Sequence, residues 1–377
     1  MSKKIKICFF SPASYPFFVP ENKSIHGGAE FQMYLLATKL AKNPDFNVLF
    51  IVGDYQQKGT EFFENIRLIK GFKHLDKENI ISKLIKALKL FYIYMKLSPD
   101  VIITTTANST IGIASFYKFL FRKKHIHRTA HLIDVNFEWI KENGFLGKIY
   151  QKGLLTADII LTQNQEHKDI LYQTHKKQSI VLKNAFPVGD YPSLEKKYIL
   201  WVGRFQQWKN PDLFVKLAQQ IPVEKFVMIC PYNPSDYKAW EKLNAEAEKI
   251  SNLTFIEKVP FHEIQPYFNQ AKIFVNTSDY EGFPNTFLQS AQGKTPIVSL
   301  NVNPDNFLNE YNCGYFCENN FDLLLEKTKT LLSNPEKIEQ KGENAFEYLK
   351  QNHDINKIGK QLEEIIYGLV NNYSSNT

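Results

Sequence analysis

Short, unbroken apolar runs alternate with amphipathic stretches along the first half of the chain. The runs are rich in β-branched residues, as expected of strands that are buried on both faces of a sheet. They lie at 5–11, 47–54, 100–106, 125–132, 157–163 and 179–185. Stretches such as 29–42 and 80–97 carry apolar residues at helical spacing. Strand–helix alternation of this kind predicts a parallel sheet covered by helices.

The same pattern starts again in the second half. Apolar runs recur at 198–204, 225–231, 253–259, 272–278, 295–300 and 314–319, and helices are predicted near 210–221, 235–250, 286–292 and 321–333. The intervening residues 186–197 contain proline and glycine and are predicted to form a linker. We therefore predict an α/β chain of two doubly wound domains, 1–190 and 191–377, with the final helix packing back on the first. The ligand site is expected in a cleft between them.

Composition argues against a disulfide-rich, metal-binding, secreted or membrane-spanning protein. Four scattered cysteines in 377 residues give no disulfide framework and no metal-ligand spacing. The start, MSKKIKICFFSP, has too short an apolar stretch for a signal peptide, and no run is long enough to span a membrane, so a cytoplasmic location is expected. Residues 1–190 carry a net charge of +11 and the remainder −4, which suggests that the two domains have different partners.

The familiar phosphate-binding and catalytic loops are missing. The sequence has no G-x-G, no Walker A loop, no H-E-x-x-H and no G-x-S-x-G. Two stretches could bind an anion without them: Gly27–Gly28 before an amphipathic helix, and Arg204 with Lys209 in a loop after a strand. Taken alone, each is better explained as an ordinary turn or a solvated loop.

A third stretch, DYEGFPN, follows a strand and precedes a short apolar helix near Thr286. The first N–H groups of such a helix point toward the edge of the sheet where ligands bind. Glu281 in this turn would repel phosphate, so we expect it to accept hydrogen bonds from neutral groups such as sugar hydroxyls. Gln289, inside the helix, could bind further hydroxyls.

In these motifs the chain resembles the GT-B glycosyltransferases of family 4, which are retaining enzymes that use a sugar nucleotide. The resemblance covers nearly the whole chain and is carried by HGGAEF, AHLID, ADIILTQ, LKNAF, VGRFQQWKN and SDYEGFPNTFLQSAQGKTPIVS. The last two motifs are specific, and the order and spacing of the others strengthen the match.

The resemblance implies roles for individual residues. Arg204 and Lys209 would hold the donor diphosphate, and Glu281 would contact the transferred sugar. Gly28 would approach the diphosphate from the first domain, and His131 would lie beside the anomeric carbon. Backbone N–H groups would bind sugar and phosphate oxygens at Gly282, Phe283, Asn285 and Thr286.

The chain departs from the family pattern at one position and leaves two interpretations open at another. Gln289 stands where the family has a second glutamate that binds the nucleotide ribose, and an amide there lacks charge assistance. Without the resemblance, His131 would be interpreted as a capped or buried histidine at the end of a strand.

The implied reaction moves a sugar from a UDP- or GDP-linked donor to a glycan or lipid-linked acceptor, with retention, in cell-surface polysaccharide or lipopolysaccharide synthesis. No D-x-D occurs, so we expect metal independence, and no resident cofactor is expected. A nucleotide-sugar epimerase and a catalytically silent sugar-nucleotide or glycan-binding protein remain alternatives. The sequence lacks RNA-binding motifs, so no nucleic-acid partner is expected.

Two basic stretches suggest a partner for the first domain. Residues 79–99 contain four lysines and no acid among apolar residues at helical spacing, and 116–128 continue the pattern. Such a helix either lies on an anionic membrane, here the inner face of the cytoplasmic membrane, or is a core helix with solvated lysines.

Overall fold

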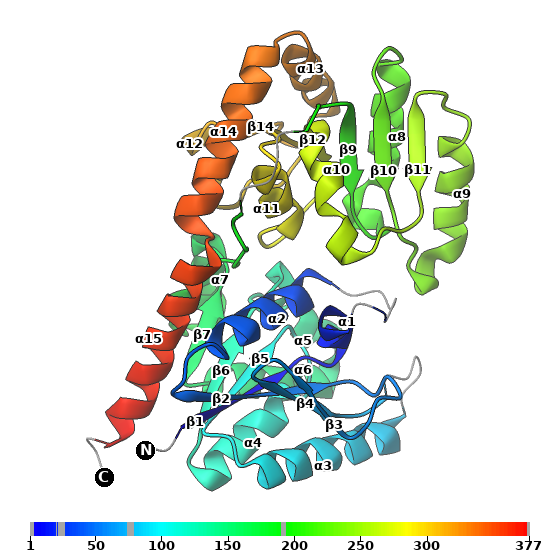
Figure 1. Cartoon of the computed structure of the whole chain (residues 1–377). Helices are drawn as coiled ribbons and strands as arrows, with labels where there is room; N and C mark the ends of the chain where they lie inside the picture. Colours follow the sequence, from blue (N-terminus) through cyan, green and yellow to red (C-terminus); the bar gives the residue numbers. More distant parts are fainter. Residues whose placement is uncertain (1–3, 20, 22–26, 74–78, 190–193, 375–377) are drawn as a thin grey trace. The chain divides into compact units, whose positions relative to one another are not determined.

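The computed structural model describes residues 4–19, 21, 27–73, 79–189 and 194–374 (Figure 1). It divides into two compact units, Met1–Ala185 with Ile355–Thr377, and Phe186–Asp354. The boundary predicted at 190/191 falls in a segment that lies outside the described residues. The final helix, α15 (Ile355–Ser374), belongs to the first unit, where it packs against α2 (Gly28–Leu40).

The first unit is built on an eight-stranded sheet with the order β3-β4-β2-β1-β5-β6-β7-β8. All neighbouring strands are parallel except β3 and β4. The strands are β1 (Ile5–Phe10), β2 (Phe46–Val52), β3 (Thr60–Phe63), β4 (Ile66–Lys70), β5 (Val101–Thr105), β6 (Lys124–Arg128), β7 (Ile159–Thr162) and β8 (Ile180–Val181). The predicted parallel sheet is confirmed.

The edge hairpin β3–β4 was not predicted. Its two strands are joined by Glu64 and Asn65, and Glu64 adopts a φ of +48°, as tight hairpin turns require. Side chains along β3 alternate between exposed and half-buried, so this strand lacks the continuous apolar run that marks the central strands.

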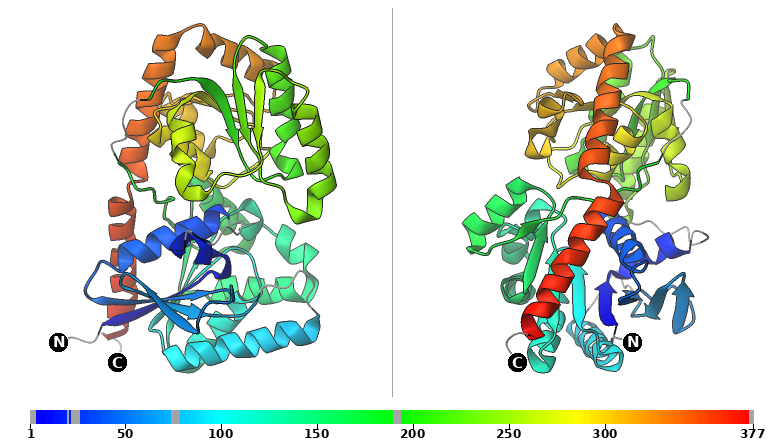
Figure 2. Two further views of the ribbon diagram at one scale, coloured as in Figure 1. Left: turned by 45° about the vertical axis from the view of Figure 1, so that its right-hand side comes forward. Right: turned by 60° about the vertical axis from the view of Figure 1, so that its left-hand side comes forward.

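Helices cover both faces of the first sheet (Figure 2). Cys8 of β1 packs against α3 (Ile80–Leu97) and α4 (Ile111–Phe121). Phe9 points to the other face, where Phe50 contacts Phe18, and the ring of Phe18 meets Tyr34 of α2. The remaining helices of this unit are α1 (Tyr15–Phe18), α5 (Glu138–Glu142), α6 (Gly144–Thr156) and α7 (Gln165–His175).

Helix α3 has the bounds that the sequence predicts because a capping residue marks its start and a left-handed residue before a proline marks its end. The side chain of Asn79 accepts a hydrogen bond from the backbone N–H of Ser82. At the other end Ser98 adopts the left-handed conformation and Pro99 follows.

The predicted basic stretch 116–128 does not form one helix. Residues 116–121 end α4, but 124–128 form β6, an inner strand in which His125, Ile126, His127 and Arg128 are buried. The strand predicted over 125–132 is confirmed, whereas the continuation of a basic helix through 116–128 is wrong, because 124–128 pair with apolar strands on both sides. Lys118 and Lys123 also form ion pairs with Asp158 and Asp100.

The second unit holds six parallel strands in the order β11-β10-β9-β12-β13-β14. The strands are β9 (Tyr198–Val202), β10 (Phe226–Ile229), β11 (Leu253–Ile256), β12 (Ala271–Asn276), β13 (Ile297–Ser299) and β14 (Gly314–Phe316). Counted along the chain this order is 3-2-1-4-5-6, that of doubly wound nucleotide-binding sheets.

Helices cover both faces of the second sheet as well. Helices α8 (Pro211–Gln220), α9 (Tyr237–Ala247) and α13 (Phe321–Leu332) share one apolar cluster with the strands. On the other face Phe274 of β12 contacts Phe268 of α10 (Gln265–Asn269) and Phe287 of α11 (Asn285–Gln292). Helices α12 (Phe307–Glu310) and α14 (Pro335–Asn352) complete the unit. Within the described residues, no helix combines the length and the apolar character needed to cross a bilayer.

Two buried histidines lie side by side on β6 in the first unit. The Thr104 hydroxyl is 2.9 Å from His125 Nε2 and 2.9 Å from His127 Nδ1, and all three residues are buried. Burial, with the nearby His127, lowers the pKa of His125 well below its usual value, and burial lowers the pKa of His127 to about 3. Both imidazoles are therefore neutral in the folded chain at pH 5, where the unfolded chain, with a histidine pKa of about 6.5, would protonate them.

We expect the folded state to lose stability as the pH falls below about 6.5. In that range the unfolded chain binds protons that the folded chain does not bind. Each histidine therefore lowers the unfolding free energy by up to about 1.4 kcal/mol per pH unit, until the pH reaches its pKa in the folded state. His127→Asn should make the slope of unfolding free energy between pH 6 and 4 shallower by about one proton. Urea unfolding at several pH values measures this, with the exposed His262→Asn as control. Equal slopes for His127→Asn and the wild type would contradict the assignment.

Candidate active site

The order of the strands reverses between β9 and β12. These strands are parallel neighbours, but the chain leaves β9 toward β10 on one side and leaves β12 toward β13 on the other. The loops after their carboxyl ends therefore diverge and open a crevice, which is where ligands bind in open α/β sheets. The loop after β9 carries Arg204 and Lys209, and the loop after β12 carries Glu281.

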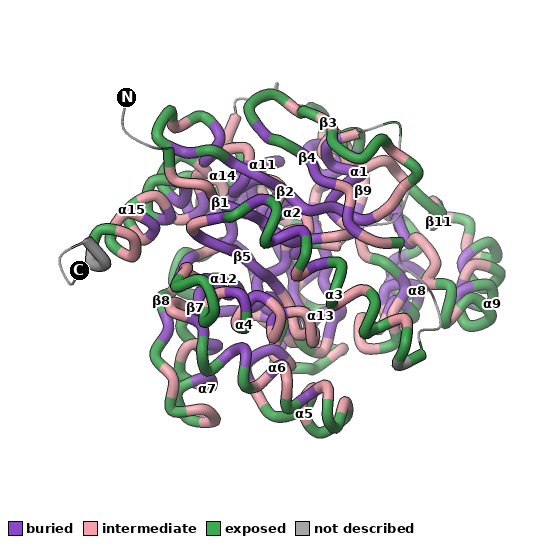
Figure 3. Tube along the Cα trace, turned by 90° about the horizontal axis from the view of Figure 1, so that it is seen from below, coloured by how far each residue is buried: buried purple, intermediate pink, exposed green. Residues whose placement is uncertain are grey.

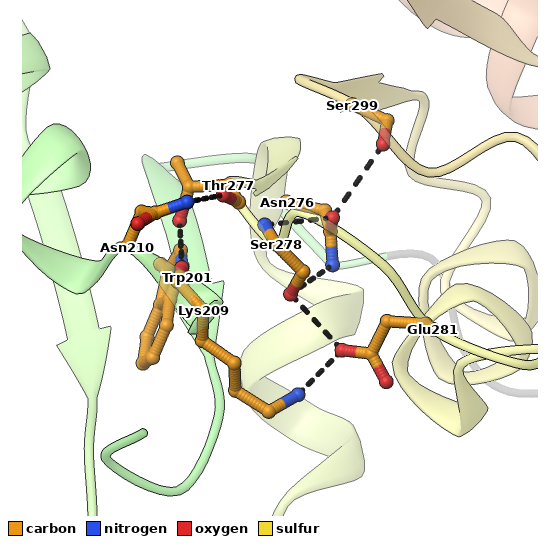
Figure 4. Close-up of polar contacts among 8 residues, drawn as sticks. All are labelled: Trp201, Lys209, Asn210, Asn276, Thr277, Ser278, Glu281 and Ser299. Atoms are coloured by element: carbon orange, nitrogen blue, oxygen red, sulfur yellow. Dashed lines mark hydrogen bonds and ion pairs between the residues drawn. The ribbon is translucent and has the colours of Figure 1, made fainter. Parts of the chain in front are cut away.

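Lys209 and Glu281 meet at this point (Figure 4). Lys209 Nζ lies 2.5 Å from Glu281 Oε1, and their side chains are 17% and 11% exposed. The Ser278 hydroxyl donates to the same carboxylate oxygen at 3.0 Å, and Asn276 Nδ2 lies 3.4 Å from the Ser278 oxygen. Both side chains are therefore largely shielded from water, unlike the solvated loop that is the alternative explanation for Lys209.

Side-chain hydrogen bonds fix the two loops to each other behind this ion pair. The Thr277 hydroxyl donates to the Lys209 carbonyl at 2.6 Å and accepts from Trp201 Nε1 at 2.9 Å. Asn210 Nδ2 donates to the Thr277 carbonyl at 3.1 Å and to Asp279 Oδ1 at 2.6 Å. Asn210 adopts a φ of +44°, and this left-handed residue ends the turn before α8 begins at Pro211.

An aromatic pair borders the ion pair and was missed from the sequence. The rings of Trp208 and Tyr280 stack with centroids 5.1 Å apart and planes 15° apart. Lys209 Nζ lies 4.5 Å from the centre of the Trp208 ring, a cation–π distance. The sequence did hold a signal, since each aromatic residue directly precedes one member of the ion pair.

Arg204 keeps a charge that no carboxylate neutralises. It is exposed, and none of the described residues forms an ion pair with it. Gly203 before it leaves room for the neighbouring side chains: a Cβ there would lie 3.0 Å from the Trp201 ring and 3.4 Å from Lys209 Cδ. With Lys209 paired to Glu281, Arg204 is the side chain in this loop with a full positive charge for an anion.

The turn after Glu281 is anchored in the core by Phe283. This ring is buried and packs against Phe287 and Phe307, with His353 4.6 Å away. Pro284 precedes α11 in an extended conformation, and no side chain caps the helix there. The predicted backbone donors Gly282, Phe283, Asn285 and Thr286 therefore lie at a helix start whose position the core fixes.

Gln289 is the fifth residue of α11 and is 95% buried. Its backbone carbonyl accepts from Gln265 Nε2 and from the Gly293 N–H. Among the described residues none hydrogen-bonds its side-chain amide. An amide in this state is available to a ligand hydroxyl.

The remaining predicted residues belong to the first unit. Gly27 caps α2 in an extended conformation and Gly28 is its first residue, whereas residues 24–26 lie outside the described part of the chain. His131 follows β6 and is exposed, so it is not buried, but it is the N-cap residue of the turn Leu132–Asp134, as the capped alternative expects. Its backbone N–H donates to Asp134 Oδ2, a buried carboxylate that also accepts from Ala130 and fixes this turn.

No metal-binding cluster is found in the part of the chain that the structure describes. No group of three or more His, Cys, Asp or Glu side chains is arranged there to hold an ion. Cys313 and Cys317 are buried, and burial raises the pKa of both thiols to about 12, so both stay protonated at neutral pH.

Comparison with known sequences points to one family. Residues 190–348 match the family "Glycosyl transferases group 1". An uncharacterised glycosyltransferase of Methanocaldococcus jannaschii is 20% identical over 93% of both chains. The O-antigen chain mannosyltransferase RfbU of Salmonella typhimurium is 23% identical over 42% of this chain and 48% of its own length.

Solved structures share the fold over nearly the whole chain. Sucrose-phosphate synthase from Thermosynechococcus elongatus superposes with a TM-score of 0.77 at 16% identity, covering 97% of this chain and 99% of the other. Anabaena HepE, solved with UDP and glucose, gives a TM-score of 0.72 at 14% identity, covering 97% and 100%. The predicted GT-B architecture of two doubly wound units is confirmed.

We expect the Lys209–Glu281 pair to stabilise the second unit. Lys209→Met should cost about 1–2 kcal/mol in unfolding free energy, below the 3–5 kcal/mol of a fully buried pair because both groups keep some contact with water. Glu281→Gln should cost less, since the amide oxygen still accepts from Lys209 and Ser278. Urea unfolding of both variants and their double mutant gives the coupling energy.

The exposed pair Lys294–Glu343, at 2.7 Å but about half exposed on each side, is the control. The double-mutant cycle of this control pair should give a coupling energy of about 0.5 kcal/mol or less. A Lys209–Glu281 coupling no larger than this would show that the short contact does not stabilise the loops.

Proposed function

Because residues 190–348 of this chain match the family "Glycosyl transferases group 1", we propose that it transfers a sugar from a nucleotide-diphosphate donor to a glycan or lipid-linked acceptor, with retention of anomeric configuration. The observation that carries the proposal is the Lys209–Glu281 pair at the strand-order reversal. Beside it lie Arg204, which can bind an anion, and the start of α11.

The donor diphosphate binds at Arg204 and at the start of α11. The bond between the anomeric carbon and the diphosphate oxygen breaks, and the leaving group gains negative charge. Arg204, the helix-start N–H groups and the hydrogens of Lys209 that Glu281 does not use stabilise that charge. No D-x-D is present, so in this proposal these groups supply the stabilisation that a metal ion supplies elsewhere.

Glu281 binds the sugar. Lys209 and Ser278 hold one oxygen of its carboxylate, so the group is oriented before the donor arrives. Its bonds to sugar hydroxyls strengthen as the ring gains positive charge toward the transition state. The acceptor oxygen attacks from the face that the diphosphate leaves, and its proton passes to the departing phosphate oxygen, which accounts for retention without a covalent nucleophile.

Two relatives support a proposal for the donor and for the class of pathway. HepE was solved with UDP and glucose, and RfbU is an O-antigen chain mannosyltransferase, so we propose a UDP- or GDP-linked sugar and a role in cell-surface polysaccharide or lipopolysaccharide synthesis. Gln289 binds the ribose as a neutral amide. The roles that the family resemblance implies for His131 and Gly28, which both belong to the first unit, stay predictions.

We expect the protein to bind a nucleoside diphosphate without a divalent cation. Calorimetry with UDP, GDP and ADP in the presence of a chelator should show binding of at least one. Arg204→Gln should weaken that binding by roughly 10- to 100-fold, the loss of a charge-assisted hydrogen bond. Arg67→Gln, an exposed arginine in the first unit, is the control. A folded protein that gives no heat with any of the three would refute the donor site.

We expect Glu281→Gln to separate nucleotide binding from transfer. The mutant should bind the free nucleoside diphosphate as the wild type does, because that ligand lacks the sugar. Its turnover with the full donor should fall by about 100-fold, or about 2.7 kcal/mol. The exposed Glu263→Gln is the control.

Nucleotide sugars and candidate acceptors supply the assay, with release of nucleoside diphosphate as the readout. If Glu281→Gln turned over at the wild-type rate, the DYEGFPN turn would have a structural role only and no role in sugar transfer. Conversion of the donor into an epimer without an acceptor would identify the protein as an epimerase instead. Binding without any turnover would leave a sugar-nucleotide-binding protein.

A further inference from the structure

An apolar stripe runs along the outer face of α3. Its exposed members recur every three or four residues and are 43–68% exposed: Ile81, Leu84, Ile85, Leu88, Tyr92 and Met95. Since an α-helix completes a turn in 3.6 residues, these positions share one face. The residues that pack into the first sheet, Leu90, Ile93, Tyr94 and Leu97, lie on the opposite face. Helix α3 is therefore apolar on two sides, unlike an ordinary surface helix.

Helix α4 extends this surface. Phe116, Phe119 and Leu120 are 56%, 82% and 54% exposed and share a face of α4 that does not contact the sheet. The Phe91 ring joins the two helices, since its centre lies 5.4 Å from that of Phe116 and 6.3 Å from that of Phe121. The α3–α4 patch is defined as Ile81, Leu84, Ile85, Leu88, Tyr92, Met95, Phe116, Phe119, Leu120 and Phe121.

The patch is larger than chance exposure explains. At a rough 50–100 Å² per side chain, ten such residues exceed the few hundred Å² that ordinary monomers expose in one place. The inner strands β1, β2 and β5 are mostly buried, whereas exposed residues recur along the whole of α3 (Figure 3). The cost of this exposure to water is offset only when something covers the patch.

Positive charge borders the patch. Helix α3 contains four lysines and no acid, and Lys89 and Lys96 are exposed at the edge of its apolar stripe. Arg122 follows directly after α4 and is exposed as well. Within the described residues no carboxylate forms an ion pair with any of these three, in contrast to Lys118 and Lys123.

We propose that the α3–α4 patch docks on the surface of an anionic lipid bilayer. Apolar side chains enter the boundary between headgroups and acyl chains, and the lysines at the rim contact anionic headgroups. The exposed charges at the rim, Lys89, Lys96 and Arg122, are all positive and α3 holds no acid, which complements a surface of anionic headgroups. This surface lies within the first unit and does not depend on the proposed function. If the acceptor is lipid-linked, docking brings the enzyme to the membrane that holds it.

Co-sedimentation with vesicles, without any nucleotide sugar, tests the proposal. The full chain should bind vesicles of phosphatidylcholine with about one-third phosphatidylglycerol at low salt, and binding should fall as ionic strength rises. Neutral phosphatidylcholine vesicles should bind at least tenfold less. Lys89→Gln with Lys96→Gln should weaken binding on the order of 25-fold, at about fivefold per lysine. The control is Lys238→Gln with Lys249→Gln, two exposed lysines of the second unit.

A second pair of variants tests the apolar part. Leu88→Gln with Phe119→Gln should weaken vesicle binding by tenfold or more, whereas Val223→Gln, at an 89% exposed valine of the second unit, should not. Because all these side chains are exposed, thermal unfolding should show intact folding, and nucleotide binding should be unchanged. Indifference to lipid charge, or equal losses in patch and control variants, would overturn the proposal. A second outcome would also overturn the proposal: a wild-type protein that binds no vesicles but forms a dimer in solution, which Leu88→Gln with Phe119→Gln converts into monomer. The patch would then be an interface with a second copy of the chain.

Discussion

The reversal of strand order between β9 and β12 is the constraint on which the candidate site depends. Hydrogen bonds hold these two strands side by side, while their onward connections run in opposite directions. That geometry brings Lys209 and Glu281 together although 72 residues separate them in the chain. Every other feature of the site, including the Thr277 and Asn210 hydrogen bonds and the aromatic pair, depends on the same two loops.

The Lys209–Glu281 pair has an electrostatic consequence for the neighbouring groups. A carboxylate beside a phosphate site would repel the ligand if its charge were free. Lys209 neutralises it at close range, so Glu281 can present an ionised oxygen to a sugar without expelling the diphosphate. The positive charge that the diphosphate needs then comes from Arg204 and from the start of α11. The two loops thus divide the recognition of a neutral sugar from that of an anionic leaving group.

In the first unit, apolar surface is exposed as well as buried. Its helix α3 packs one apolar face on the sheet and exposes another, with exposed lysines at the rim. Folding alone accounts for the first face, because burial of that face stabilises the sheet. It does not account for the second, which only an external surface can cover. Part of the basic excess of residues 1–190 lies in α3, which holds four lysines and no acid.

The sequence by itself determined the architecture and the chemistry of the main loops. Continuous β-branched runs gave twelve of the strands, because strands buried on both faces need apolar residues at every position. The bounds of α3 could be predicted from the sequence because Asn79 and Pro99 act through local hydrogen bonding and sterics. The Arg204–Lys209 loop and the DYEGFPN turn were found because their residue types and order are specific, although their roles remain predictions.

Only the tertiary structure decided how these pieces meet. That Glu281 is shielded and paired follows from a contact across 72 residues, and local composition carries no information about such a contact. The edge hairpin β3–β4 lacks the buried run that reveals central strands, so its pairing follows from the sheet and not from its own pattern. The sequence left two competing patterns in 116–128, a basic helix and a strand from 125 onward, and 124–128 form the strand because β5 and β7 supply hydrogen-bonding partners on both sides. Charge and periodicity act over a few residues, whereas burial and ion pairing depend on which distant segments the sheet order brings together.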